Sequence, residues 1–177
     1  TFSTLFPKSQ GAIGLRRALS DLFNQISQAL TQGVNLIILS DRGVNAEMLS
    51  LPILLATSAV HHNLIRAGDR NKASIIVETA EVREVNHFSL LAGYGANAIN
   101  PYLAFETLAD LCAKKLYFGD LPAKTVQYNY VKAINKGMLK VFSKMGISTL
   151  FSYCGAQIYE AIGLDHYVVE RYFTGTV

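Results

Sequence analysis

The feature that most constrains the fold is the regular succession of amphipathic helices and short apolar runs. In these runs polar and apolar residues do not alternate. Between residues 15 and 30, leucine and isoleucine recur at steps of three and four, which predicts a helix with one apolar face. The run VNLIIL follows and is typical of a strand buried on both faces. The same order recurs, and the further strands expected are ASIIV at 73–77, ANAI at 96–99 and ISTLFS at 147–152.

Proline, glycine and acidic residues mark the helices between these runs. Pro52 suits the first position of a helix that Gly68 ends, and Glu81 and Glu84 suit the first turn of the next one. Further helices are expected after Pro101, over a long amphipathic stretch from about residue 123 to 145, as a short helix over GAQIYEAIG, and after Asp165 as its cap.

This alternation predicts an α/β fold of repeated βα units with a mainly parallel sheet. The spacing of the strands is compatible with a TIM barrel, but four strands cannot close an eight-stranded barrel. We therefore expect a TIM-barrel-like but incomplete fold, a half-barrel fragment whose edges need more chain, a partner or a covering helix. The chain begins at Thr1 and ends at Val177 without an obvious terminal signal, which agrees with a segment of a longer protein.

The stretch LAGYGANAIN, residues 91–100, carries two glycines that could hold a phosphate or mark a turn. A phosphate-binding loop needs a strand first and a helix second, so that the ligand meets helix amides. Here the order is reversed, since a helix precedes Gly93 and a strand follows Gly95. The order favours a helix end and a turn.

Composition limits the classes of partner. Half of the residues are hydrophobic, 16% are charged and the net charge is +3, which indicates a protein with a packed core. The basic residues form no stripe interleaved with aromatics, and no apolar run is long enough for a bilayer, so neither nucleic acid nor a membrane is an expected partner. Cys112 and Cys154 are too few and too distant in sequence for a zinc or iron–sulfur ligand set, and a reducing compartment is expected.

Polar residues follow each expected strand, where parallel sheets carry their ligand sites. They could bind a polar metabolite, and the arginine is suited to a carboxylate. The candidates for a ligand site are Asp41, Arg42, Glu78, Asn100 and Tyr102. The alternative is structural: Asp41 would pair with Arg42 or cap the following turn, and Glu78 would lie near the next helix.

The sequence offers no catalytic residue and no metal site. His61 and His62 are adjacent, so on a helix they diverge by about 100°, whereas paired metal ligands are three or four residues apart. His87 is an isolated helix residue in this interpretation, and no Gly-x-Ser-x-Gly motif or cysteine–histidine pair supports a hydrolase.

Three long segments resemble the large chain of glutamate synthase, in both its ferredoxin-dependent and its pyridine-nucleotide-dependent forms. They include LIILSDRGVNAEMLSLPILLATSAVHHNLIRAG, GYGANAINPYLAFETL and YVKAINKGMLKVFSKMGISTLFSYCGAQIYEAIGL, and the likeness extends from Phe6 to the end of the chain. The resemblance places residues 1–124 in the later part of the central α/β domain. Residues 125–177 would lead toward the FMN-binding synthase barrel, packed with the first part as one unit or apart from it.

The resemblance implies an enzyme that converts glutamine and 2-oxoglutarate into two glutamates and channels ammonia between domains. Its partners would be the amidotransferase and FMN-barrel domains of the same polypeptide, with ferredoxin or a reductase subunit as electron donor. FMN and an iron–sulfur cluster would serve the full-length enzyme, and no cofactor is expected in this segment, which lacks the nucleophilic cysteine and the cysteine cluster. The compartment would be the cytoplasm, or the plastid stroma in a photosynthetic eukaryote.

Within that resemblance the segment would be a structural, linking domain without catalytic residues. Ser152, Tyr153 and Gln157, where the chain approaches the barrel, are the candidates for inter-domain contacts. A different hypothesis is a small binding module for 2-oxoglutarate or glutamate at the strand ends. A free-standing flavin oxidoreductase has only the barrel-like spacing in its favour.

Overall fold

A four-stranded parallel sheet forms the centre of the computed structural model, which describes residues 1–177. Its strands lie in the order β1 (Phe2–Ser3), β3 (Leu36–Ser40), β5 (Ser74–Glu78) and β6 (Ala98–Asn100). Every pairing in this sheet is parallel, and β3 is paired with β5 along its whole length. Neighbours in the sheet follow the order of the chain, as in a barrel, whereas a doubly wound sheet reverses at a switch point. The predicted α/β class with a mainly parallel, incomplete sheet is confirmed.

Helices connect the successive strands and bury them. α1 (Gly11–Thr31), α2 (Ile53–Ala67) and α3 (Val85–Gly93) each lie between two neighbouring strands in the chain. The main core combines their apolar faces with Ile37 and Ile75, which are completely buried in β3 and β5. Burial of a side chain of this size stabilises the fold by about 1.5–3 kcal/mol.

α2 has the ends that its sequence predicts, apart from one residue at its start. Pro52 lies just before the helix and Gly68 ends it in the left-handed conformation, with φ 75°. Glu81 does not belong to the next helix, which begins at Val85. Its carboxylate accepts hydrogen bonds from the Ile53 amide at 3.2 and 3.3 Å and so caps α2. Burial raises the pKa of Glu81.

A second, two-stranded sheet lies beside the amino terminus. β2 (Leu5–Pro7) pairs with β4 (Met48–Ser50) in antiparallel register. Neither strand is predicted from the sequence, since each is only three residues long and β2 ends in Pro7. A short 3-10 turn, η1 (Lys8–Gln10), joins β2 to α1.

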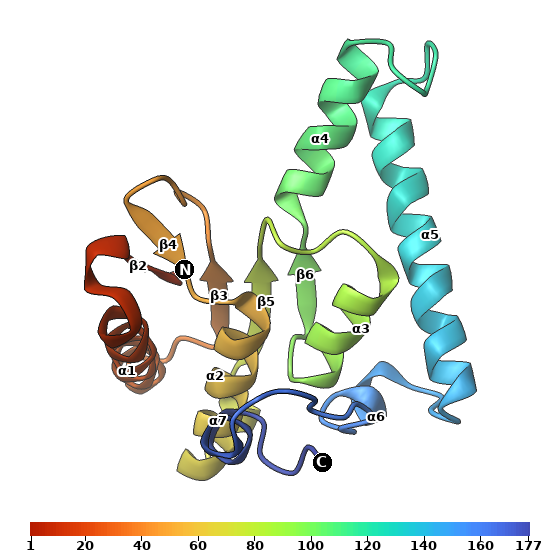
Figure 1. Cartoon of the computed structure of the whole chain (residues 1–177). Helices are drawn as coiled ribbons and strands as arrows, with labels where there is room; N and C mark the ends of the chain where they lie inside the picture. Colours follow the sequence, from red (N-terminus) through yellow and green to blue (C-terminus); the bar gives the residue numbers. More distant parts are fainter.

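Two long helices leave the sheet as a hairpin, with α4 rising from the end of β6 and α5 returning beside it (Figure 1). α4 (Tyr102–Ala113) and α5 (Ala123–Lys144) confirm the predicted helices. α5 contributes its buried residues Val126, Ile134 and Phe142 at steps of eight, on a face that contacts α4 and α3. α4 buries no residue fully, so this arm of the hairpin contributes little to the core of the chain.

The predicted fourth strand at 147–152 is wrong. Residues 147–149 are irregular, and α6 (Leu150–Tyr153) follows, because Thr149 caps it by accepting a hydrogen bond from the Ser152 amide at 3.2 Å. The short helix expected over 155–163 is also absent, since Gly155, Gln157 and Gly163 all have positive φ.

The last helix has the predicted cap. α7 (His166–Tyr172) begins after Asp165, whose carboxylate accepts a hydrogen bond from the Tyr167 amide at 2.9 Å. α7 contacts α2, so the C-terminal segment folds back under the amino-terminal ends of the strands (Figure 1).

Candidate functional site

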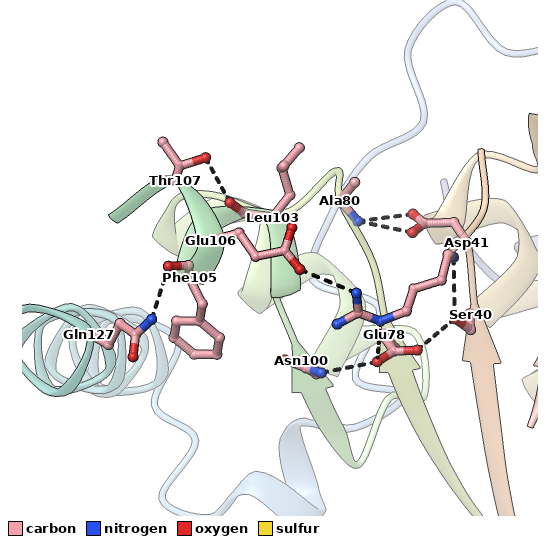
Figure 2. A network of polar contacts seen from close by, with 11 residues as sticks. Ser40, Asp41, Glu78, Ala80, Asn100, Leu103, Phe105, Glu106, Thr107 and Gln127 are labelled. Carbon is pink, nitrogen blue, oxygen red and sulfur yellow. Dashed lines mark hydrogen bonds and ion pairs between the residues drawn. The ribbon is translucent and has the colours of Figure 1, made fainter. Parts of the chain in front are cut away.

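The carboxyl ends of β3, β5 and β6 form one polar cluster, as Figure 2 shows. β3 contributes Ser40 and the loop residues Asp41 and Arg42, β5 contributes Glu78, and β6 contributes Asn100. These side chains lie together because parallel strands in register end at one edge, with Ser40 opposite Glu78 and Glu78 opposite Asn100. The predicted candidates at the three strand ends therefore lie close together, and their role as a ligand site stays a prediction.

Glu78 is at the centre of the cluster. Its carboxylate accepts hydrogen bonds from Ser40 Oγ at 2.6 Å, Arg42 Nε at 2.9 Å and Asn100 Nδ2 at 3.3 Å. The bonds from Ser40 and Arg42 lower the pKa of Glu78. The carboxylate is thus ionised near neutral pH and has three donors from three segments.

Asp41 forms a separate set of bonds, although it neighbours Arg42 in sequence. Its carboxylate accepts from Thr79 Oγ1 at 2.6 Å and from the Ala80 amide at 3.0 and 3.1 Å. The side chain is almost fully buried, at 1% exposure. Asp41 therefore does not pair with Arg42, which was one of the two structural roles expected for it. It does cap a loop, but this is the loop after β5 and not the turn that follows Asp41 itself.

Arg42 and Tyr102 close the cluster on its solvent side. The guanidinium carbon of Arg42 lies 4.0 Å from the ring centre of Tyr102, and Arg42 Nη1 is 3.3 Å from Glu106 Oε1. Burial, followed by the contact with the Asp41 carboxylate, raises the pKa of Tyr102 to about 12. The phenol stays protonated at neutral pH, so it can donate a hydrogen bond but cannot act as a base.

Sequence reasoning missed Ser40 and Glu106. Ser40 lies opposite Glu78 in the parallel register, and its hydroxyl donates to the Glu78 carboxylate. Glu106 is four residues after Tyr102 on α4, so both lie on one helix face. That spacing was the available signal for Glu106.

The three inter-domain candidates occupy different environments. Ser152 is exposed on α6, and Gln157 is half-buried, with its amide donating to the Thr174 carbonyl. Tyr153 is completely buried, stacks on Phe142 with ring centres 4.3 Å apart, and lies in a small core with Ala92. Only Ser152 and Gln157 have surface available to another domain.

Neither a metal nor the cofactors implied by the resemblance fit these residues. No group of three histidine, cysteine, aspartate or glutamate side chains could hold an ion, and Cys112 lies on α4 while Cys154 follows α6. Gly95 does not cradle a phosphate, since a Cβ atom there would lie 2.5 Å from Nδ1 of His61. The predicted turn is confirmed, with Gly93 the last residue of α3 and φ 113° at Gly95. None of the helices has the length and hydrophobicity needed to span a bilayer.

Comparison with known proteins gives a consistent result. The family model described as "Glutamate synthase central domain" matches residues 1–165. The chain is 51% identical to "Glutamate synthase [NADPH] large chain" of Bacillus subtilis over 92% of its length, and 42% identical to "Glutamate synthase [NADH]" of Saccharomyces cerevisiae over 97%. It is 46% identical over 99% of its length to "Ferredoxin-dependent glutamate synthase 1, chloroplastic/mitochondrial" of Arabidopsis thaliana. The matches cover 10%, 8% and 12% of these three relatives.

Proposed function

Because the chain belongs to the glutamate synthase central domain family, we propose that it is a structural, linking domain without catalytic residues of its own. The full-length protein would convert glutamine and 2-oxoglutarate into two glutamates and carry ammonia between its domains. The chain spans about a tenth of the length of the curated relatives it matches, so the chemistry would be done by other parts of such a polypeptide.

The observation that supports a structural role is the bonding of the strand-end cluster. Asp41 and Glu78 accept from donors of the chain itself, and Arg42 donates to Glu78 and Glu106. A catalytic acid or base needs a proton that it can exchange with substrate, whereas Glu78 is held ionised and Tyr102 protonated. The cluster instead ties together β3, β5, β6 and α4.

Exposed apolar side chains supply a surface for a neighbouring domain. Phe151 on α6 is 92% exposed, Leu139 on α5 is 65% exposed, and Ile162 lies in the following loop at 87%. Large apolar side chains at this exposure are typical of surfaces that a partner covers. The amidotransferase and FMN-barrel domains of the same polypeptide would be those partners, together with Ser152 and Gln157 as polar contacts at the rim.

FMN and the iron–sulfur cluster would be held outside this segment, as would the contact with ferredoxin or a reductase subunit. The compartment would be that of the whole polypeptide, the cytoplasm or the plastid stroma.

The test uses Asp41→Asn and Glu78→Gln in the full-length protein. We expect glutamate formation per folded enzyme to change by less than about 10-fold, since a general acid or base contributes about 100-fold or more. A loss of about 100-fold in kcat, with circular dichroism unchanged, would assign chemistry to the cluster and reject the proposal.

A metabolite-binding module is the second candidate, and the exposure of Arg42 favours it. Its side chain is 48% exposed, and its second terminal nitrogen makes no hydrogen bond within the chain. Calorimetric titration of this chain with 2-oxoglutarate and with glutamate separates the two functions. Binding that disappears in Arg42→Gln supports the module, and no heat at millimolar ligand rejects it.

A further inference from the structure

A cavity of about 300 Å³ lies at the edge of the sheet opposite the strand-end cluster. It is bounded by the second half of α2, the end of α3 and the segment after α6. Its polar lining consists of His61, His62, Cys154 and Gln157. None of these residues takes part in the strand-end cluster.

The tautomer of His61 is fixed by its neighbour Arg70, which belongs to the 3-10 turn η2 (Arg70–Lys72). Arg70 Nε donates a hydrogen bond to His61 Nδ1 at 2.8 Å, so Nδ1 presents a lone pair and the ring proton lies on Nε2. The Nε2–H group makes no hydrogen bond within the chain, although His61 is only 8% exposed. One donor of the chain without an internal partner therefore lies on a residue that lines the cavity.

His62 provides a second such group. It is 7% exposed, lines the same cavity, and neither of its nitrogens forms a hydrogen bond within the chain. A neutral imidazole carries one N–H donor. Burial lowers the pKa of both His61 and His62, so each ring is neutral at physiological pH and acts as a donor without a charge. Both rings line the cavity, so an acceptor bound there would meet two N–H donors that form no hydrogen bond within the chain.

The surroundings of the two rings are positive. Arg70 bonds only to neutral groups, which are His61, two backbone carbonyls and the Asn97 amide oxygen. Arg66 on α2 donates to the Arg171 carbonyl and forms no ion pair. The nearby acid, Asp69, is paired with Lys72. Two guanidinium groups without a carboxylate partner favour an anion over a cation.

The same geometry argues against a metal. Nε2 of His61 could bind a metal only after the proton moved to Nδ1, where it would meet the N–H group of Arg70. Burial raises the pKa of the Cys154 thiol, so this sulfur is protonated and a poor ligand.

We propose that this cavity is a binding site for a small oxyanion, a carboxylate or an inorganic phosphate, which accepts hydrogen bonds from His61 Nε2 and from His62. Gly95 and Arg70 hold the His61 ring in place from behind, and the segment after α6 closes the cavity. The site lies on the opposite edge of the sheet from the strand-end cluster, and it does not depend on the linking role proposed above.

The experiment is a titration of the 15N-labelled chain with sodium phosphate and separately with sodium acetate, at constant ionic strength set with sodium chloride. The chain has four histidines, two in the cavity and two on the surface, His87 and His166, which are internal controls. Long-range 1H–15N spectra report the tautomer and the environment of each imidazole. We expect saturable shifts of the His61 and His62 nitrogens, with His61 in the Nε2–H form and with the surface histidines unmoved.

Substitution of His62 by phenylalanine keeps the volume of the ring and removes its donor. We expect His62→Phe to weaken binding by about 10-fold or more, as for loss of a hydrogen bond to a charged group, and His166→Phe to leave it unchanged. Saturation by phosphate alone or by acetate alone identifies the anion. Equal shifts in all four histidines, or none in the cavity pair with either salt, would overturn the proposal, and the wild-type titration decides this even if His62→Phe does not fold.

Discussion

Substitution of Gly95 by alanine tests the packing that holds the His61 ring. At φ 113° an L-residue is strained, and the added Cβ would lie 2.5 Å from His61 Nδ1 and 2.6 Å from its Cγ. The ring cannot move aside freely, because Arg70 Nε holds it at 2.8 Å and the Arg70 fork is bound to the Gly95 carbonyl at 3.0 Å.

Two effects lower the free energy of unfolding of the Gly95→Ala variant. Backbone strain contributes about 1–3 kcal/mol, and overpacking in a closed site contributes about 1–3 kcal/mol more. We expect a loss of about 3–4 kcal/mol in the free energy of unfolding. For a domain of this size that lowers Tm by about 10 °C.

Gly33→Ala is the matched control, since Gly33 also has positive φ, 82°, but a Cβ there meets nothing within 4 Å. It should lose only the strain of a left-handed residue, about 1–2 kcal/mol. Urea unfolding followed by circular dichroism measures both variants, and an unchanged m-value shows that the comparison is valid. The same change in a His61→Ala background should cost only the backbone strain, about 1–3 kcal/mol, because the overlap is gone. If Gly95→Ala and Gly33→Ala lose the same stability in the wild-type background, the contact with His61 carries no energy and the reasoning fails.

Three further outcomes follow from the polar groups. Asp41→Ala should lower the free energy of unfolding by about 2–3 kcal/mol in urea titrations, because the buried Thr79 hydroxyl and Ala80 amide lose their acceptor; a change below about 0.5 kcal/mol would contradict this. Because the pKa of Glu78 is lowered in the folded chain, its ionised carboxylate stabilises the fold above pH 4.5, the ordinary pKa. This stabilisation is lost as the pH falls through the folded-state pKa. The stability difference between wild type and Glu78→Gln should therefore shrink below about pH 4.5, and a constant difference would refute it. The pKa of His61 falls from 6.5 to about 4 on burial, so the unfolded chain binds the extra proton and stability should drop as pH falls from 6.5 to 4; His61→Gln should flatten that part of the curve, and an unaltered slope would count against it.

The sequence predicts well those elements whose environment is set by local pattern. The apolar runs of β3 and β5 differ from the stepped pattern of α1 and α5. The predicted burial on both faces is wrong, however, since Ile37 and Ile75 are completely buried whereas Leu36 is 47% exposed. Their expected ranges, 34–39 and 73–77, differ from the observed ones by one or two residues, within the usual uncertainty of element ends.

The failures occur where tertiary contacts override local preference. Residues 147–152 have the β-branched and aromatic composition of a strand, but they pair with no strand. Tyr153 instead enters the small core beside Phe142, and Thr149 supplies a helix cap, so the chain turns into α6. β1 has only two residues, and its pairing with β3 depends on a partner more than thirty residues away.

For the strand-end cluster, the sequence predicts part of the membership and not the bonding. The rule that parallel strands share an edge brings Asp41, Glu78 and Asn100 together, but it does not indicate Ser40 or Glu106. It could not assign Arg42 to Glu78, since that choice depends on the directions in which the side chains of Asp41 and Arg42 leave the turn after β3. The sequence correctly gives no reason to pair His61 and His62 as metal ligands, but it does not indicate their role as donors. For His61 that role depends on Arg70, nine residues later, which no helical spacing indicates.

A bound ligand would have different effects at the strand-end cluster and at the cavity on the opposite edge of the sheet. The strand-end cluster joins β3, β5, β6 and α4 through bonds that are already made, so occupation there would have to break them. The cavity at the other edge lies between the βα core and the segment after α6, and its donors are unpaired. An anion held there binds only when that segment is packed on α2, and by linkage it stabilises the packed state by about 2.7 kcal/mol at 100 times its Kd. Protection of residues 154–177 from proteolysis should therefore increase with phosphate or acetate in the wild type and stay constant in His62→Phe, which would connect occupancy of the cavity to the order of this segment.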